Sequence, residues 1–361
     1  MSYRKKLCWI TVLLIIAVMI RFYSGDPSRV ENGYSTVFFP KISAFLRALF
    51  GWFPFSLGDI GYGAAVIYLV FMFYRLIKFL IRRRKDHLRP KLIKGSLSFL
   101  MFFSIIYIVF NLFWGINYNR IGIAGQLGLN IKKYSVEELK TVNGLLVQKI
   151  NASKQSLLHN KTKYPGNSEL FSMTTGAYAA VAKKYSFLSY RHVSLKPSIW
   201  GWLGNYTGFL GYYNPFTGEA QVNTTVPKFT QPFTACHETA HQLGYAKEME
   251  ANFVGYLAAA ASTDTVFHYS VYTDLFSYAN RTLYFADSSA ALQYRKMLLP
   301  EVMADFKQRR EFNLAHTSFL EPVFRAIYGV FLQSNQQPMG ILSYDEVTGF
   351  IIAYYKKFGK I

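Results

Sequence analysis

Three long apolar runs within residues 1–118 constrain the fold of this chain more than any other feature. They cover residues about 7–23, 55–76 and 97–114. Each is close to the roughly 20 residues that a helix needs to cross the hydrocarbon core of a membrane. The whole sequence is 51% hydrophobic and 18% aromatic, which is too apolar for an ordinary soluble enzyme. The sequence therefore predicts three transmembrane helices in a membrane domain over residues 1–118.

The first apolar run has two interpretations. A basic start, Arg4-Lys5-Lys6, followed by a short apolar core also fits a cleaved signal peptide. No small-residue cleavage site follows in Arg21-Phe22-Tyr23-Ser24. We therefore favour an uncleaved anchor, and the two later runs support this choice.

Residues about 40–52 carry apolar side chains at helical spacing. These are Ile42, Phe45, Leu46, Leu49 and Phe50. Lys41 and Arg47 lie beside them in the sequence. The pattern predicts an amphipathic helix along the membrane surface. A core helix in a small extracytoplasmic cap is an equally good interpretation.

Basic residues set the expected orientation. The net charge is +20, and basic residues are concentrated in Arg82-Arg83-Arg84-Lys85 and at Arg89, Lys91 and Lys94. Loops of this kind remain in the cytoplasm. Three spans then predict a multi-pass membrane protein, with residues 119–361 as an extracytoplasmic domain. No nucleic-acid recognition motif accompanies the charge, so we expect a lipid bilayer, and not nucleic acid, as a partner.

Residues 119–361 are expected to form one mainly helical domain with a small sheet. Ser135 and Glu138 have the spacing of a capping box at the start of a helix. Helical periodicity returns after Ala251 and continues to the end of the sequence. Between these helices, residues 208–222 hold two strand-like segments around the turn Pro215-Phe216-Thr217-Gly218. The predicted class of this domain is therefore α+β.

The segment His237-Glu238-Thr239-Ala240-His241 is the strongest indication of chemistry. Residues four apart lie on one face of a helix, so both imidazoles can bind one Zn²⁺. Glu238 can reach a water at the metal and act as the general base for amide hydrolysis. The pattern predicts a zinc metalloendopeptidase with His237 and His241 as metal ligands. The alternative is a buried histidine pair without metal, but a carboxylate between two histidines is costly to bury alone.

A catalytic zinc ion needs a third protein ligand and an open position. Gly244 can end the first helix, and a second helix can begin at Glu248. Glu248 and Glu250 point about 200° apart on a helix, so at most one of them reaches the metal. We choose Glu248, with Glu250 as the alternate; Glu248 could otherwise only stabilise the helix N-terminus. Asn252 lies on the face of Glu248 and can orient a ligand histidine.

Residues outside this motif are candidates for substrate contacts. An extended peptide can add to a sheet edge in the 208–222 region, although an ordinary hairpin is the alternative. Polar contacts there could come from Tyr212, Tyr213 and Asn214. Three later residues are candidate oxyanion donors, although single residues of these types more often have structural roles. These are His268, Tyr269 and Tyr272.

Five segments spread along the chain carry a family resemblance. They are residues 114–118, 211–220, 235–244, 248–253 and 340–344. Together they resemble an uncharacterised bacterial membrane family, the domain of unknown function number 3810. The resemblance covers most of the chain, including the membrane part, and it implies no particular substrate. Together with the expected orientation, it implies the bacterial cytoplasmic (inner) membrane, with the extracytoplasmic domain in the periplasm.

The site itself is similar to gluzincin metallopeptidases of the membrane-embedded prenyl-protein and heat-shock type. In those enzymes a Glu-x-x-Ala-Asp helix follows the histidine helix. The resemblance implies His237, His241 and Glu248 as ligands, Glu238 as base, and Asn252 at the position of the family's Asp. This sequence departs from the pattern in the short gap before Glu248 and in having Asn instead of Asp.

The sequence therefore predicts a mainly α membrane protein with three transmembrane helices and an extracytoplasmic, gluzincin-like α+β domain. We expect Zn²⁺ as the cofactor and envelope or membrane-associated proteins as substrates. The main alternative is a catalytically silent zincin-like receptor or envelope assembly factor, although a silent site would not need Glu238. A channel or transporter is disfavoured because Asp59 is the only acidic residue in the apolar runs.

Overall fold

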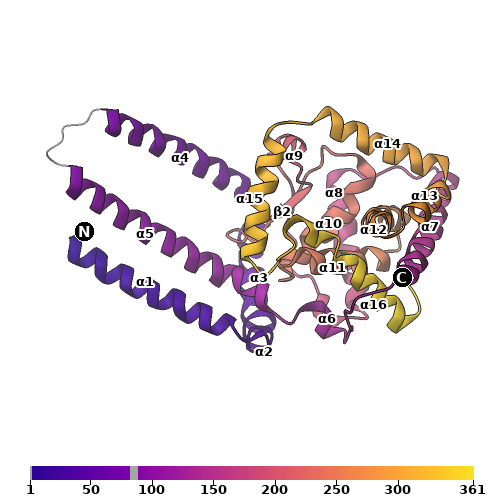
Figure 1. Cartoon of the computed structure of the whole chain (residues 1–361), viewed down its shortest axis with the longest axis horizontal. Coiled ribbons are helices and arrows are strands. Elements are labelled where there is room, and N and C mark those ends of the chain that lie inside the picture. The colour runs from indigo at the N-terminus through magenta and orange to yellow at the C-terminus, as the bar shows by residue number, and fades with distance from the viewer. Residues whose placement is uncertain (1, 82–87) are drawn as a thin grey trace.

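The computed structural model describes residues 2–81 and 88–361. Three long helices extend from one side of a mostly helical domain (Figure 1). They are α1 (Tyr3–Ser24), α4 (Leu57–Ile81) and α5 (Leu88–Phe113). All three are long and apolar enough to cross a membrane. The prediction of three helices of this length and composition is confirmed.

Two of these helices extend beyond their apolar runs. α4 continues to Ile81, and α5 begins at Leu88, well before residue 97. Arg and Lys have high helix propensity, so basic residues such as Lys94 do not interrupt the helical backbone. The segment Arg82-Arg83-Arg84-Lys85, which contributes to the predicted orientation, lies outside the described residues.

The chain between α1 and α4 folds onto the domain. It forms α2 (Pro27–Arg29), the π-helical segment η1 (Val30–Phe38) and α3 (Phe39–Phe50). Arg47 of α3 is buried and donates to the carbonyl oxygens of Gln242 (3.0 Å) and His192 (2.9 Å). Phe45 of the same helix is 64% exposed. α3, predicted over 40–52, therefore packs on the domain as a cap helix would and still presents apolar side chains outward.

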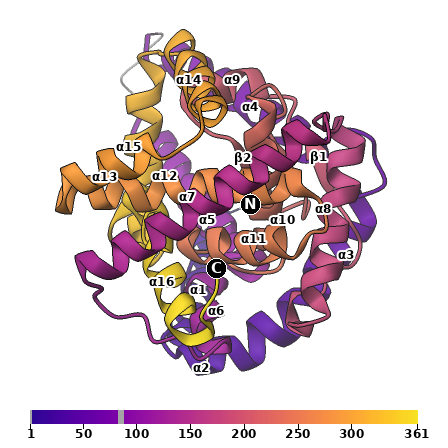
Figure 2. The ribbon, with the colours of Figure 1, turned by 90° about the vertical axis from the view of Figure 1, so that its right-hand side faces the viewer.

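The domain consists of helices around a small sheet. Its helices are α6 (Gly122–Gln126), α7 (Val136–His159), α8 (Asn167–Ala182), α9 (Gly201–Thr207), α10 (Gln231–Gln242), α11 (Glu248–Ala261), α12 (Thr265–Ala286), α13 (Ser288–Lys296), α14 (Pro300–Ala315), α15 (Leu320–Ser334) and α16 (Val347–Phe358). Short 3₁₀ segments are η3 (Gly115–Asn119), η4 (Ser186–Leu188), η5 (Lys228–Thr230) and η6 (Gly340–Tyr344). The capping box of Ser135 and Glu138 is present at the start of α7. This helix lies across the face opposite the three long helices (Figure 2).

The sheet has three short strands in the order β1-β3-β2. They are β1 (Leu195–Pro197), β2 (Gly211–Tyr213) and β3 (Ala220–Val222). β3 pairs in parallel with β1 and antiparallel with β2, with Tyr212 opposite Gln221. The two segments predicted within 208–222 are therefore β2 and β3, and β2 is an edge strand.

Helix α10 is the central helix of the domain. All 12 of its residues are buried, and it packs against α8, α11, α12 and β3. A helix that is covered on every side is typical of a domain core. Pro232 lies in its first turn, where proline is tolerated because the N–H it lacks would have no partner within the helix. The prediction of a mainly helical protein with a small sheet is confirmed.

Candidate metal centre

Two consecutive helices bring the predicted ligands together. His237, Glu238 and His241 lie on α10, and Glu248 is the first residue of α11. Between them, Gly244 has a φ of +89°, a left-handed conformation that glycine adopts without steric cost. The turn at this glycine reverses the chain and returns Glu248 to the histidine-bearing face of α10.

Three side-chain atoms converge at this face. The Nε2 atoms of His237 and His241 are 3.1 Å apart. Oε2 of Glu248 lies 3.2 Å from the first of these nitrogens and 3.5 Å from the second. Ligand atoms bound at about 2.0–2.1 Å around a tetrahedral zinc ion are separated by about 3.3 Å. The three atoms therefore form a triangle of the size of one face of a zinc coordination tetrahedron.

The other ring nitrogens fix the tautomers of both histidines. Nδ1 of His237 lies 2.8 Å from Oδ1 of Asn252, and Nδ1 of His241 lies 2.7 Å from the carbonyl oxygen of Tyr245. Because both partners are acceptors, each Nδ1 carries a proton and each Nε2 of a neutral ring presents a lone pair. These lone pairs face Oε2 of Glu248, which is buried and has no hydrogen-bond donor. With both rings neutral the arrangement is repulsive unless a positive charge, either a metal ion or a proton on His241, lies between the three atoms, so these residues fit a metal ion.

Burial and charge shift the two site carboxylates in opposite directions. Burial acts to raise the pKa of Glu248, but the two histidines outweigh it and hold that pKa well below its usual range. Against the effect of burial, Glu248 raises the pKa of His241 to about 8. Burial raises the pKa of Glu238 to about 7. Glu248 is therefore an anionic candidate ligand, whereas Glu238 is suited to exchange a proton near neutral pH.

The alternate ligand and the orienting amide have different surroundings. Glu250 lies against Gly122, and it is not part of the cluster formed by the two histidines and Glu248. Asn252 is beside His237, and its amide nitrogen donates to the carbonyl oxygen of Tyr344 (3.4 Å). The structure thus brings Glu248 and Asn252, but not Glu250, to the histidines.

The metal centre adjoins a cavity of about 250 Å³. Its walls are largely aromatic and come from α4, α5, η3, β2, α15 and η6. The aromatic lining residues are Tyr62, Phe110, Trp114, Tyr118, Tyr212, Tyr213, Phe216, Tyr328, Phe331 and Tyr344. An apolar cavity with a few convergent polar groups is typical of a ligand-binding site. A larger cleft of about 570 Å³, formed by α12, α13 and α14, contains none of the metal-centre residues.

A family model matches residues 34–352 of the chain. Its description is "Protein of unknown function (DUF3810)". The chain belongs to the DUF3810 family. Comparison with curated proteins and with solved structures finds no match. The span matched by the DUF3810 model includes α10 and α11, so the metal centre lies within the part of the chain that the family shares.

Two tyrosines that sequence analysis did not assign to the site contact the candidate ligands of this DUF3810 protein. Tyr328 on α15 donates to Oε1 of Glu248 (2.6 Å). The ring of Tyr344 in η6 lies nearly parallel to that of His237, with the ring centroids 6.2 Å apart. Residues 340–344 entered the sequence analysis only through the family resemblance, and no sequence signal indicated Tyr328.

Four candidate contact residues have structural roles instead. Oδ1 of Asn214 accepts hydrogen bonds from the N–H groups of Phe216 and Thr217, and Asn214 does not line the cavity. On α12, His268 bonds the carbonyl oxygen of Ser262 (2.8 Å), Tyr269 donates to Asp305, and Tyr272 is buried. None of these three lines the cavity, so the structure does not bring these candidate oxyanion donors to the site. Periodicity predicted the helix but not which of its faces meets α10.

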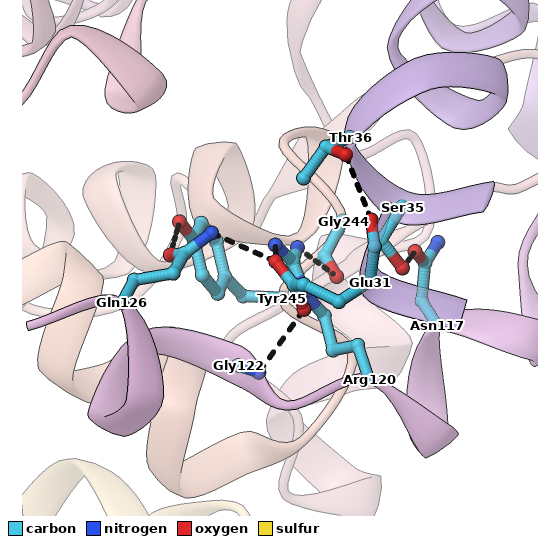
Figure 3. Close-up of polar contacts among 9 residues, drawn as sticks. All are labelled: Glu31, Ser35, Thr36, Asn117, Arg120, Gly122, Gln126, Gly244 and Tyr245. Carbon is cyan, nitrogen blue, oxygen red and sulfur yellow. Dashed lines mark hydrogen bonds and ion pairs between the residues drawn. The ribbon is translucent and has the colours of Figure 1, made fainter. Parts of the chain in front are cut away.

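A buried polar network holds the turn that follows α10 (Figure 3). Arg120 donates to both carboxylate oxygens of Glu31, at 2.6 and 3.0 Å, and to the carbonyl oxygen of Gly244 at 3.1 Å. Its guanidinium also lies over the ring of Tyr245, 4.6 Å from the centroid. The Tyr245 carbonyl is the group that orients His241. The DUF3810 chain thus fixes the backbone next to a candidate ligand with an ion pair from outside α10.

Proposed function

We propose that this DUF3810 protein is a membrane-anchored, zinc-dependent metallopeptidase. The observation that supports the proposal most strongly is the convergence of three buried ligand atoms, Nε2 of His237, Nε2 of His241 and Oε2 of Glu248, within 3.5 Å of one another. Two imidazoles and one carboxylate are a usual ligand set of catalytic zinc, which keeps a fourth position open. The adjoining cavity gives a substrate access to that position.

Glu238 is the proposed general base. Zinc in this site would polarise the scissile carbonyl and lower the pKa of a water molecule. Oε2 of Glu238 is buried and has no hydrogen-bond partner, so it is free to accept a proton from the attacking water. The same oxygen then delivers the proton to the nitrogen of the leaving amine as the C–N bond breaks. Burial raises the pKa of this carboxyl above its usual range, which favours its role in proton exchange.

The neighbours of these groups have orienting roles in the proposal. Asn252 and the Tyr245 carbonyl hold the two imidazoles with Nε2 toward the metal position. Tyr328 occupies Oε1 of Glu248 and so leaves Oε2 for the metal. Tyr344 lines the cavity beside His237, and we assign its hydroxyl as a donor to the oxygen of the scissile carbonyl.

The edge strand β2 offers a binding surface for an extended peptide. A substrate that pairs with β2 would be held by main-chain hydrogen bonds beside the catalytic groups. Gly211 allows the Glu238 side chain to lie against β2, because a Cβ at that position would lie 2.6 Å from Oε1 of Glu238. The scissile bond would then lie next to the base.

We also propose that the protein spans the bacterial cytoplasmic membrane with its domain on the periplasmic side. The start of α1, the end of α4 and the start of α5 lie at the same end of the long helices, away from the domain (Figure 1). Basic residues such as Lys5, Lys78 and Lys94 belong to these segments. Membrane proteins keep such basic ends in the cytoplasm.

Metal analysis and a matched variant test the proposal. Purified protein loaded with zinc should retain about one ion per chain and should hydrolyse a mixture of fluorogenic peptides. Glu238→Gln should retain zinc and lose hydrolysis by about 10²–10⁴-fold. His241→Ala should lose both.

Two results would contradict this function. Failure of the wild-type protein to retain zinc would refute the metal centre. Zinc retention without hydrolysis, together with polypeptide binding that Glu238→Gln does not change, would support the silent receptor instead.

A further inference from the structure

The cavity at the metal centre is partly walled by helices of membrane-spanning length. Tyr62 on α4 and Phe110 on α5 line it, and Tyr328 and Phe331 on α15 line it as well. The rings of Phe110 and Phe331 have centroids 6.2 Å apart. The metal centre therefore opens at the end of the domain from which the long helices extend, and not at the opposite face that α7 covers (Figure 2).

Helix α4 stands apart from the other two long helices (Figure 1). α1 and α5 pack against each other and bury side chains such as Ile10 and Ile108. In α4, by contrast, every residue from 64 to 78 is exposed. In a bilayer, lipid would surround this part of α4, including the side that faces α5. A membrane-embedded segment of another protein can occupy the same space.

Helix α15 adds an apolar stripe at the level where the long helices meet the domain (Figure 1). Val323, Ile327 and Val330 follow one another at helical spacing and are 51%, 66% and 63% exposed. Phe331 lies next to this stripe and lines the cavity. Such a surface is suited to contact with lipid or with an apolar substrate segment at the membrane interface.

The start of α4 is joined to the sheet and to the residues beside it, and the hydroxyl of Tyr212 on β2 donates to Asp59. The N–H of Gly58 donates to Glu219 (2.6 Å), and Asp59 accepts from the N–H of Ile199 (2.6 Å). One turn further along α4, the ring of Tyr62 lies 5.9 Å from that of Tyr212 on β2. A peptide paired with β2 would therefore reach α4 at the wall of the cavity.

We infer that the substrate is a membrane-embedded polypeptide, cleaved in the extended segment that adjoins its transmembrane helix. This inference rests on the proposed metallopeptidase function and names the substrate class of the same site. The substrate helix lies between α4 and the α1–α5 pair, and the residues that follow it extend along β2 to Glu238. Hydrolysis adds one water across the peptide bond, releases the outer part of the substrate and leaves its helix in the membrane.

The wall of the cavity favours a polypeptide over a lipid as the occupant. The outer edge of β2 presents main-chain N–H and C=O groups, which an extended peptide can pair with and an acyl chain cannot. The groups that converge beside this edge, the two histidines with Glu238 and Glu248, are those required for amide hydrolysis.

The test uses the zinc-loaded full-length protein in liposomes. A library of reporters joins a folded module to a single apolar helix through short linkers of varied sequence. Two comparison libraries carry the same linkers, one with an acyl chain in place of the helix and one with no anchor. The acyl-anchored set shares the high local concentration at the membrane, so it isolates the effect of the helix itself. Because only the helix can pack between α4 and α5 and position the linker at the site, we expect helix-anchored linkers to be cleaved faster than acyl-anchored linkers by about tenfold or more.

Variants in the cavity wall supply an independent readout. Tyr62→Ala and Phe110→Ala should slow cleavage of helix-anchored reporters more than cleavage of acyl-anchored ones. Val18→Ala is the matched control, because Val18 is 68% exposed on α1 and does not line the cavity. It should leave both rates unchanged. Zinc content verifies that each variant is folded.

The outcomes separate this inference from the proposed function. Equal rates for helix-anchored and acyl-anchored reporters would overturn the lateral route and leave the peptidase function standing. Faster cleavage of the unanchored library would have the same meaning. Absence of cleavage in all three libraries would overturn the peptidase function itself.

Discussion

Arg120→Met should destabilise the protein strongly. Arg120 and Glu31 are only 4% and 6% exposed, and they form a two-pronged ion pair at 2.6 and 3.0 Å. Methionine replaces the apolar stem of the arginine but leaves Glu31 as a buried anion. Its remaining partners would be two neutral donors, the N–H of Gly122 and the amide of Gln126. Removal of one partner from a buried ion pair costs about 3–5 kcal/mol.

Thermal unfolding in mild detergent, followed by tryptophan fluorescence, measures this loss. A change of 1 kcal/mol shifts the Tm of a domain of roughly 150–250 residues by about 2–4 °C. Arg120→Met should therefore lower the Tm by roughly 10 °C. The double variant Glu31→Leu/Arg120→Met should recover most of the loss, because the cost comes from the uncompensated charge. A single variant within about 2 °C of wild type, or a double variant less stable than Arg120→Met, would refute this reasoning.

Three further outcomes are expected. Burial acts to raise the pKa of Glu31, but Arg120 outweighs burial and holds this pKa below its ordinary value of about 4.5. The unfolded chain therefore binds a proton at Glu31 more readily than the folded chain does. The stability that this pair contributes is complete above about pH 4.5 and is lost as the pH falls through the folded-state pKa of Glu31. A Glu31→Gln variant whose Tm depends on pH as that of the wild type does would contradict this expectation. Asn252→Ala should weaken zinc binding by about 10–100-fold in competition with a chelator, because His237 loses the acceptor for its Nδ1–H; unchanged affinity would exclude the orienting role. Tyr344→Phe should lower kcat by about 10²–10³-fold with little change in KM, and an effect confined to KM would show that the hydroxyl binds substrate without stabilising developing charge.

Features that depend on neighbours along the chain were predictable. Apolar length predicted the three long helices, and the capping box at Ser135 predicted the start of α7. The turn at 215–218 predicted the β2–β3 hairpin. The spacing of His237 and His241 required both rings to lie on one face of a helix, and the structure has them on one face of α10.

Features that depend on tertiary packing were not predictable from this sequence. Tyr328 is 80 positions from Glu248, and Glu31 is 89 positions from Arg120. No periodicity relates residues on different helices, so neither contact has a signature in the sequence. For the same reason, the sequence could not show whether the candidate donors on α12 face the site. Strand β1 was missed because its three residues, Leu195–Pro197, are too few to display an alternating pattern.

Two buried arginines that depend on the chain before α4 contact carbonyl oxygens at the end of the histidine helix. Arg47 of α3 donates to the carbonyl oxygen of Gln242, and Arg120, held by Glu31 of η1, donates to that of Gly244. Cations at this end of a helix are stabilising. A proteolytic cut after α5 would release the domain without Arg47 and without Glu31, the counter-ion of Arg120. Release of the domain would thus remove contacts that hold the candidate metal ligands in place. Any hydrolase activity would then require the domain to stay attached to its membrane helices.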